Sequence, residues 1–292
     1  MIRLIGIFVG LGFAVVALWA FGWGAAAVID EGQFVEPSAE HEFHREAEPL
    51  HLASNGPFGH WDNQQLQRGY QVYKEVCSAC HSMNLVALRD LAQFGYSEAE
   101  VKAEAASWTV PGIDQTTGET TTRPGTPTDY FPSPYPNDIA ARAANNNAIP
   151  PDLSLITKAR HGGAAYVHSL LTGYREQPAE LLAEFPDAET PAGLHFNPYF
   201  ANLNIAMAPP LVADGQVTYA DGTEATIDQM AADVAAFLTW TAEPTLVKRN
   251  QTGWAVLGFL LFVTVLAWFA KKQVWAPAKP ESRKDALDKK LD

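Results

Sequence analysis

The chain has 292 residues and a formal net charge of −13, with 33 Asp and Glu residues against 20 Lys and Arg residues. This acidic balance argues against a nucleic-acid-binding protein, which needs a basic surface to neutralise phosphates. The length allows one large domain or two small ones, and only two cysteines exclude a disulfide-rich scaffold.

The first feature along the chain is an uncharged apolar run over residues 4–29, which follows Arg3 and precedes Asp30. The run is long enough to cross a bilayer. Its positive start and its small residues at 25–27 are also typical of a secretory signal. We therefore interpret residues 1–29 as either a signal peptide or a retained signal anchor. The run lacks the Arg- and Ser-rich character of a mitochondrial presequence, which favours a bacterial inner membrane.

A helix is predicted from Asp62 onward, after a polar and irregular segment over residues 30–61. Asp62 and Gln65 have the spacing of a capping box. Residues with apolar or aromatic side chains then recur at spacings of four, three and four, which marks one helix face. These residues are Leu66, Tyr70, Tyr73 and Cys77.

The predicted helix leads directly into the sequence Cys-Ser-Ala-Cys-His at residues 77–81, which contains both cysteines of the chain. Two thiols at this spacing can form thioethers with the vinyl groups of a haem, and His81 can then bind the iron. A structural zinc site would need a second pair of ligands, and a thioredoxin-like redox pair needs no following histidine. A disulfide across two intervening residues would be strained. The motif therefore favours one covalently attached haem c.

Several shorter elements are expected between the haem motif and residue 241. Residues 108–137 are rich in proline and glycine, which predicts a surface loop. Helices are predicted over 153–159 and 164–171, and two Asp-Gly pairs predict a β-hairpin near 211–225. A longer helix over 227–241 begins with a capping box of Thr226 and Gln229.

Spacing alone leaves several candidates for the iron ligand opposite His81. Met83 lies too close to His81 in the chain, and Met230 occupies the inner face of a predicted helix, where methionine usually fills the core. Met207 is favoured because it lies in a loop that two prolines stiffen. His161 and His195 remain alternative ligands. A methionine opposite a histidine would raise the reduction potential.

A second uncharged apolar run covers residues 253–270 and is followed by Lys271 and Lys272. This run predicts a transmembrane helix over 248–272, and the basic residues after it predict a cytoplasmic tail over 273–292. Residues 30–247 then form an exported domain on the periplasmic side. That domain carries the excess of acidic residues, which favours a basic partner.

The order of several further motifs resembles the cytochrome c1 family, the haem-bearing subunit of the cytochrome bc1 complex. The stretches that carry the resemblance are residues 66–73, 130–137, 141–146, 150–154, 159–163, 170–174, 196–200 and 207–210. The resemblance covers roughly residues 57–275. The predicted elements form a mainly α-helical domain with long loops and a small β-hairpin. The resemblance implies that this is a cytochrome c-like haem domain, followed by a C-terminal transmembrane helix.

The resemblance also implies roles for particular residues. Cys77 and Cys80 would attach the haem, with His81 as the proximal ligand and Met207 as the distal ligand. Arg160 would lie near a haem propionate. The pocket would also be lined by Asn145, Pro151 and Tyr166.

The predicted function is electron transfer without substrate chemistry on this chain. The resemblance implies that the haem accepts one electron from a Rieske iron–sulfur protein and passes it to a cytochrome c, in a dimeric complex that also contains cytochrome b. One alternative is a membrane-anchored c-type cytochrome that feeds a terminal oxidase directly. A peroxidase is a second alternative, but di-haem peroxidases need a second Cys-x-x-Cys-His motif, and this chain has none.

Overall fold

The computed structural model describes residues 2–30 and 38–277 of the chain. These residues are mainly helical and include two short antiparallel hairpins, which confirms the fold class expected from the sequence. The chain divides into two compact units. The larger consists of Ala47–Thr172 with Pro210–Asp292, and the smaller of Met1–Glu46 with Gly173–Pro209.

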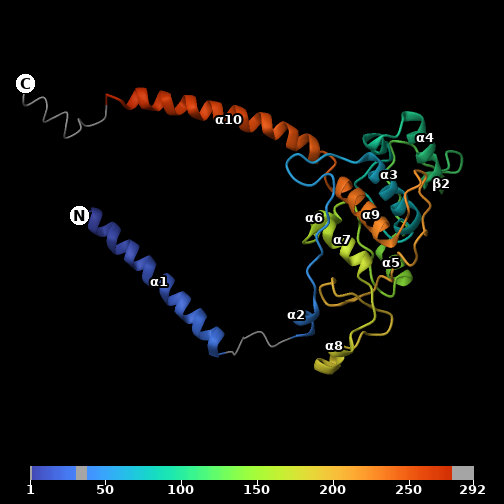
Figure 1. Cartoon of the computed structure of the whole chain (residues 1–292), viewed down its shortest axis with the longest axis horizontal. Coiled ribbons are helices and arrows are strands. Elements are labelled where there is room, and N and C mark those ends of the chain that lie inside the picture. The colour runs from blue at the N-terminus through green and yellow to red at the C-terminus, as the bar shows by residue number, and fades with distance from the viewer. Residues whose placement is uncertain (1, 31–37, 278–292) are drawn as a thin grey trace, which may run out of the picture. The chain divides into compact units, whose positions relative to one another are not determined.

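The larger unit contains the two capped helices that the sequence predicts, α3 (Asn63–Val72) and α9 (Ile227–Ala242) (Figure 1). The side chain of Asp62 accepts hydrogen bonds from the first backbone N–H groups of α3, and Thr226 accepts one from Gln229 at the start of α9. The side chain of Gln229 donates to Asp233 at 2.8 Å. It therefore supports the next turn of α9 in place of the reciprocal capping-box contact.

Helices α3 and α9 cross at Gly69, and this contact organises the core. A Cβ atom at Gly69 would lie 2.0 Å from the backbone oxygen of Asp233, so only glycine permits this approach. Buried aromatic residues surround the crossing, and the rings of Phe94 and Trp240 lie 4.7 Å apart, edge to face. The other buried aromatic members of this core are Tyr70, Tyr73, Phe131, Tyr219 and Phe237.

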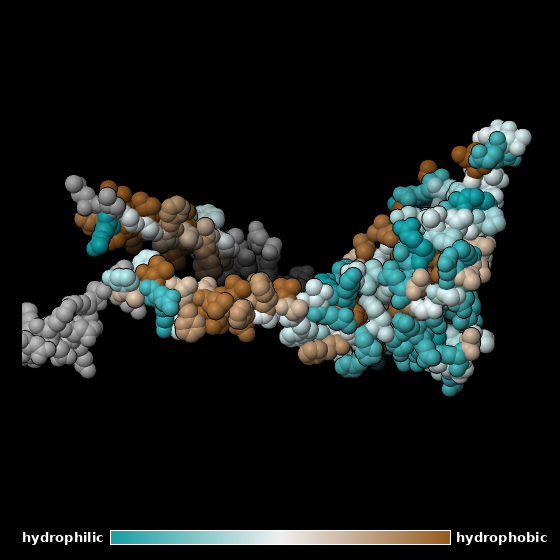
Figure 2. All heavy atoms as spheres, turned by 90° about the horizontal axis from the view of Figure 1, so that it is seen from above, coloured by the Kyte–Doolittle hydropathy of each residue, from teal (hydrophilic) through white to brown (hydrophobic). Residues whose placement is uncertain are grey.

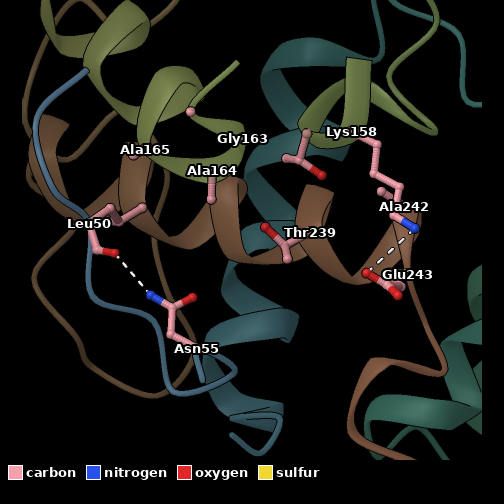
Figure 3. A pocket seen from close by; sticks show the side chains of 11 residues that line it. Leu50, Asn55, Lys158, Gly163, Ala164, Ala165, Thr239, Ala242 and Glu243 are labelled. Carbon is pink, nitrogen blue, oxygen red and sulfur yellow. Dashed lines mark hydrogen bonds and ion pairs between the residues drawn. The ribbon is translucent and has the colours of Figure 1, made fainter. Parts of the chain in front are cut away.

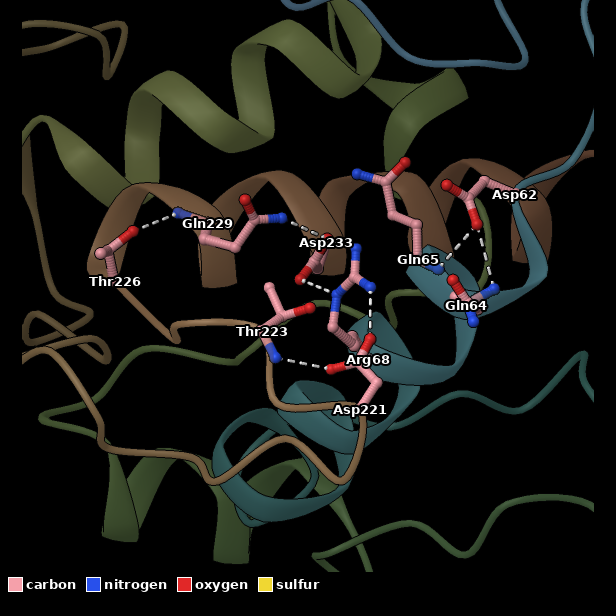
Figure 4. A network of polar contacts seen from close by, with 9 residues as sticks. All are labelled: Asp62, Gln64, Gln65, Arg68, Asp221, Thr223, Thr226, Gln229 and Asp233. Carbon is pink, nitrogen blue, oxygen red and sulfur yellow. Dashed lines mark hydrogen bonds and ion pairs between the residues drawn. The ribbon is translucent and has the colours of Figure 1, made fainter.

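A buried ion pair joins the same two helices (Figure 4). Arg68 of α3 donates to both carboxylate oxygens of Asp233 in α9, at 2.9 and 3.2 Å, and to Asp221 at 2.7 Å. The Asp233 side chain is fully buried. Burial alone would lower the pKa of Arg68, but its hydrogen bonds to Asp233 and Asp221 raise it above the ordinary value. Arg68 therefore stays charged, and the network fixes the register of α3 on α9.

Three short helices follow in the larger unit after α4 (Glu98–Ser107): α5 (Asp138–Ala144), α6 (Ile156–Ala159) and α7 (Gly163–Thr172). The bounds of α7 confirm the helix predicted over 164–171. The helix predicted over 153–159 begins later, at Ile156, because Asp152 accepts a hydrogen bond from the backbone N–H of Ser154 and forms a turn there.

The first half of the surface loop predicted over 108–137 is largely exposed, as expected, but it contains a β-hairpin. Strands β1 (Thr109–Ile113) and β2 (Thr120–Pro124) form an antiparallel hairpin in which Pro111 pairs with Thr122. Proline is tolerated here because the ribbon is two-stranded and largely exposed, so each strand is an edge strand. Gly118 has a φ of +75° in the connecting turn, a backbone conformation that favours glycine.

The hairpin expected near 211–225 is wrong, since the structure has no strand over these residues. Both Asp-Gly pairs form turns, but their carboxylates serve other segments. Asp214 accepts from the backbone N–H of Ile227 at 2.7 Å, and Asp221 accepts from Thr223 at 3.0 Å as well as from Arg68. The turn residues therefore support α9 and the ion-pair network.

The smaller unit has its own core and a second hairpin. It contains α2 (Ala39–Phe43), α8 (Ala179–Glu184), and the paired strands β3 (His195–Phe196) and β4 (Asn204–Ile205). Its apolar core cluster contains Ala39, Leu181, Phe196 and Leu203.

Two helices have exposed apolar surfaces over most of their length, α1 (Ile2–Asp30) and α10 (Leu246–Trp275). Both are long and apolar enough to cross a membrane. Figure 2 shows that apolar side chains cover the long helices, whereas hydrophilic residues dominate the visible face of the globular part. The transmembrane segment predicted over 248–272 falls within α10. Most of the predicted tail, from residue 278, lies outside the described residues.

Candidate haem site

The haem motif begins in a widened turn at the end of α3. The helix continues as one π-helical segment, η1 (Tyr73–Cys77), in which the backbone N–H of Ser78 donates to the carbonyl of Tyr73 at 2.8 Å. The N–H groups of Cys80 and His81 then both donate to the carbonyl of Cys77, at 3.1 and 2.9 Å. These bonds hold both cysteines and the histidine in one compact turn.

The imidazole of His81 has a fixed hydrogen-bond partner. Its Nδ1 lies 2.8 Å from the carbonyl oxygen of Pro151, which can only accept a hydrogen bond. Nδ1 must therefore carry the proton, and Nε2 keeps its lone pair for a metal ion. Burial lowers the pKa of His81, although the bond to Pro151 opposes this shift. A neutral imidazole with a free Nε2 is the form that binds iron.

The segment that contains Pro151 is held against the haem motif by Asp152. One carboxylate oxygen of Asp152 accepts from Ser82 at 2.9 Å and from the backbone N–H of Asn84 at 2.8 Å. Burial would raise the pKa of Asp152, but hydrogen bonds from Ser154, Asn84 and Ser82 outweigh it and lower the pKa. The charged carboxylate thus positions the carbonyl that orients His81. Asp152 is a residue of the site that the sequence interpretation missed.

The two cysteine thiols are free in the chain and partly buried. Burial raises the pKa of Cys77 to about 12, so its sulfur is protonated near neutral pH. Within the described residues there is no group of three or more His, Cys, Asp or Glu side chains that could hold a metal ion by itself. Two free thiols beside a neutral imidazole fit a haem, which both sulfurs would attach and whose iron His81 would bind.

The other predicted pocket residues of the larger unit lie at helix ends. Asn145 follows the last residue of α5, and its side chain donates to the carbonyl of Ala141 at 2.7 Å. Arg160 follows α6, is exposed, and interacts with Tyr166 of α7. Burial raises the pKa of Tyr166, which Arg160 partly offsets. The fourth predicted pocket residue, Pro151, is the one that accepts the hydrogen bond from His81 described above.

Met207 belongs to the smaller unit, where it follows β4 and is half-buried. Its backbone oxygen accepts a hydrogen bond from the hydroxyl of Tyr174 at 3.0 Å, which fixes the loop at this residue. The alternative ligand His195 lies in β3, with its ring 6.5 Å from that of Tyr174. The other alternative, His161, is exposed between α6 and α7. The choice among these ligands stays a prediction.

A helical domain in which a Cys-x-x-Cys-His turn carries an oriented, neutral histidine defines a c-type cytochrome. The sequence model of the Cytochrome C1 family matches residues 52–278. The chain therefore belongs to the cytochrome c1 family.

Three relatives illustrate the match. Cytochrome c1 of Rhodospirillum rubrum is 47% identical over 233 residues, which cover 77% of this chain and 85% of that protein. Mitochondrial cytochrome c1 heme protein of Saccharomyces cerevisiae is 45% identical over 242 residues, which cover 83% of this chain and 75% of that protein. Cytochrome b/c1 of Bradyrhizobium diazoefficiens is 45% identical over 236 residues, and the match spans 76% of this chain but only 34% of that longer protein.

Family membership confirms the expected cofactor and class of function. The protein carries one covalently bound haem c and is the electron-transfer subunit of the cytochrome bc1 complex, without catalytic activity of its own. Membership favours this function over the alternative of a cytochrome that feeds a terminal oxidase directly. It also implies cytochrome b and a Rieske iron–sulfur protein as partner subunits.

Proposed function

We propose that Cys77 and Cys80 attach the haem, that His81 and Met207 are its axial ligands, and that the chain delivers electrons from the Rieske protein to a soluble or anchored cytochrome c. The observation that carries this assignment is the hydrogen bond from Nδ1 of His81 to Pro151, because it presents Nε2 as the metal-binding atom. When bound, the haem supplies a reversible one-electron couple at its iron.

The residues of the chain then act by holding and shielding that couple. Cys77 and Cys80 restrict the group to one face of the motif turn, and Pro151 with Asp152 keeps the His81 ring from rotating. Arg160 is assigned to a haem propionate, since it is the cation next to Tyr166. Asn145, Pro151 and Tyr166 are assigned to the pocket wall, where they exclude water from the reacting centre.

The proposed arrangement in the membrane follows from α10. Residues 30–247 form the periplasmic haem domain, residues 248–272 cross the bacterial inner membrane once, and residues 273–292 form the cytoplasmic tail. Lys271 and Lys272 at the end of the apolar segment support this orientation, because positive charges favour the cytoplasmic side. Residues 1–29 are a signal peptide or an anchor. The complex is proposed to be dimeric.

Substitution of the proposed distal ligand tests the assignment. Met207→Leu keeps an apolar side chain but removes the thioether sulfur, and we expect the midpoint potential to fall by an amount on the order of hundreds of millivolts. The measurement is a redox titration followed by optical spectra. Met230→Leu is the matched control because Met230 is a fully buried core residue of α9. An unchanged midpoint in Met207→Leu, together with a shift in His161→Leu or His195→Leu, would replace Met207 as the ligand.

A further inference from the structure

The turn at residues 53–60 is rigid and presents one aromatic side chain to the outside. His60 donates from its backbone N–H to the carbonyl of Ala53 at 2.9 Å, which closes the turn. A Cβ atom at Gly59 would lie 2.2 Å from the backbone oxygen of Ser54, so glycine is required for this closure. At the tip, 81% of the Phe58 surface is exposed.

Residues 56–58 of this turn pack on the first turns of α10. The rings of Phe58 and Trp254 are stacked, with centroids 5.1 Å apart and planes 6° from parallel. Trp254 donates from its indole N–H to the carbonyl of Pro57 at 3.3 Å, and Asn250 donates to the carbonyl of Gly56 at 3.3 Å. Phe58 therefore lies at the same position along the axis of α10 as Trp254.

A second contact fixes the start of α10 on the haem domain. Glu243, which follows α9, forms ion pairs with Lys158 of α6 at 3.4 Å and with Arg249 of α10. Figure 3 shows Lys158 and Glu243 facing each other, and Asn55 bonded to Leu50 at the base of the turn. The ion pairs and the stacked rings hold α10 at two separate points, so the tip of the turn cannot move far from the helix.

The composition of α10 places Trp254 at one edge of a bilayer. The uncharged run of 253–270 would be about 27 Å long as a helix, close to the thickness of a hydrocarbon core. Trp268 and Lys272 lie at its other end, with the ammonium 3.7 Å from the ring centroid. Tryptophan at both ends of such a run is typical of the two membrane interfaces.

We propose that the turn at residues 56–58 is a second membrane contact, in which Phe58 enters the boundary between lipid headgroups and acyl chains beside Trp254. The proposal rests on the membrane insertion of α10 stated under the proposed function. Charge favours a lipid surface as the occupant: residues 49–61 contain no acidic residue, although the chain as a whole has a net charge of −13. The turn can thus approach an anionic bilayer without the repulsion that the rest of the domain would meet. Such a contact would set the tilt of the haem domain over the membrane.

The test is a spin label on the complete haem-loaded chain in vesicles of phosphatidylcholine and phosphatidylglycerol. Phe58→Cys carries the label, and collision with oxygen, which concentrates in lipid, is compared with collision with a water-soluble nickel chelate. Ile139→Cys is the matched control because its exposed fraction is also 81%. Leu261→Cys reports on the middle of α10, where the side chain is 69% exposed.

We expect the label at position 58 to collide with oxygen more often than with the nickel chelate. Its ratio of oxygen to nickel collisions should lie between that of the aqueous label at 139 and that of the lipid-embedded label at 261. A label at 58 as aqueous as that at 139, with 261 in lipid, would overturn the second contact alone. A label at 261 that is also aqueous would overturn the insertion of α10 and the proposal with it. Protection of position 58 from both reagents in the assembled complex would identify a partner subunit as the occupant and overturn the lipid contact.

Discussion

Removal of the Arg68 charge should destabilise the larger unit strongly, because it leaves a buried carboxylate without its cation. In Arg68→Met, the fully buried Asp233 loses two hydrogen bonds and keeps the one from Gln229 at 2.8 Å. Breaking a buried ion pair on one side costs about 3–5 kcal/mol. Because Gln229 still satisfies one oxygen, we expect the lower limit of about 3 kcal/mol, which is roughly a hundredfold in the unfolding equilibrium.

Urea unfolding of the detergent-solubilised chain, followed by circular dichroism, measures this loss. A loss of about 3 kcal/mol should lower the urea midpoint by about 1 M or more. Lys102→Met is the control, since its ion pair with Glu98 is exposed and should contribute little to stability. The double variant Arg68→Met with Asp233→Leu should recover much of the stability, because it removes both charges. A midpoint in Arg68→Met no lower than in Lys102→Met would refute the reasoning.

Three further outcomes are expected. Gly69→Ala should cost about 1–3 kcal/mol in the same urea titration, because its methyl group would collide with the backbone of α9; an unchanged midpoint would mean that the helices are further apart. Hydrogen bonds from the Thr223 backbone and from Arg68 lower the pKa of Asp221 from 3.8 to about 2. The stability that this carboxylate contributes is therefore present above about pH 4 and lost as the pH falls toward 2, and Asp221→Asn should flatten the stability profile in that window. Electron transfer to a basic cytochrome c should slow by about tenfold as salt rises from about 10 to 100 mM, measured by stopped flow, whereas a rate independent of salt would indicate apolar docking.

The sequence predicted the parts of the fold that depend on local signals. Helices α3 and α9 begin at side-chain caps and repeat apolar residues at helical spacing, so both follow from the chain alone. The β1–β2 hairpin did not, because Pro111 and Pro124 are ordinary loop signals and only an exposed two-stranded ribbon accommodates them. The misplaced hairpin near 211–225 has the opposite cause: its turn signals are real, but their carboxylates bond to Ile227 and Arg68.

For the candidate site too, the sequence predicted only the part that is local in the chain. Cys77, Cys80 and His81 follow from their spacing, since the motif is local in the sequence. The hydrogen bond from His81 to Pro151 joins residues 70 positions apart, and Asp152 acts over the same separation. No periodicity or cap reports such a contact. These residues could be assigned only through the family resemblance or from the structure itself.

The π-helical segment over Tyr73–Cys77 has a consequence for how the chain tolerates length changes. It holds one residue more than an ordinary helical turn, so the residues beyond it are rotated by about 100° from where a continuous α-helix would carry them. The core face of α3 and the direction of the two thiols are thereby set independently. Deletion of one residue from 74–76 would close the widened turn into an ordinary helical turn, and because that turn already absorbs one residue, both thiols would keep the side that they face. The same deletion inside α3, which has no extra residue to lose, would rotate its core face relative to the thiols by about 100°. The widened turn is therefore the place in this helix where haem attachment tolerates the loss of one residue.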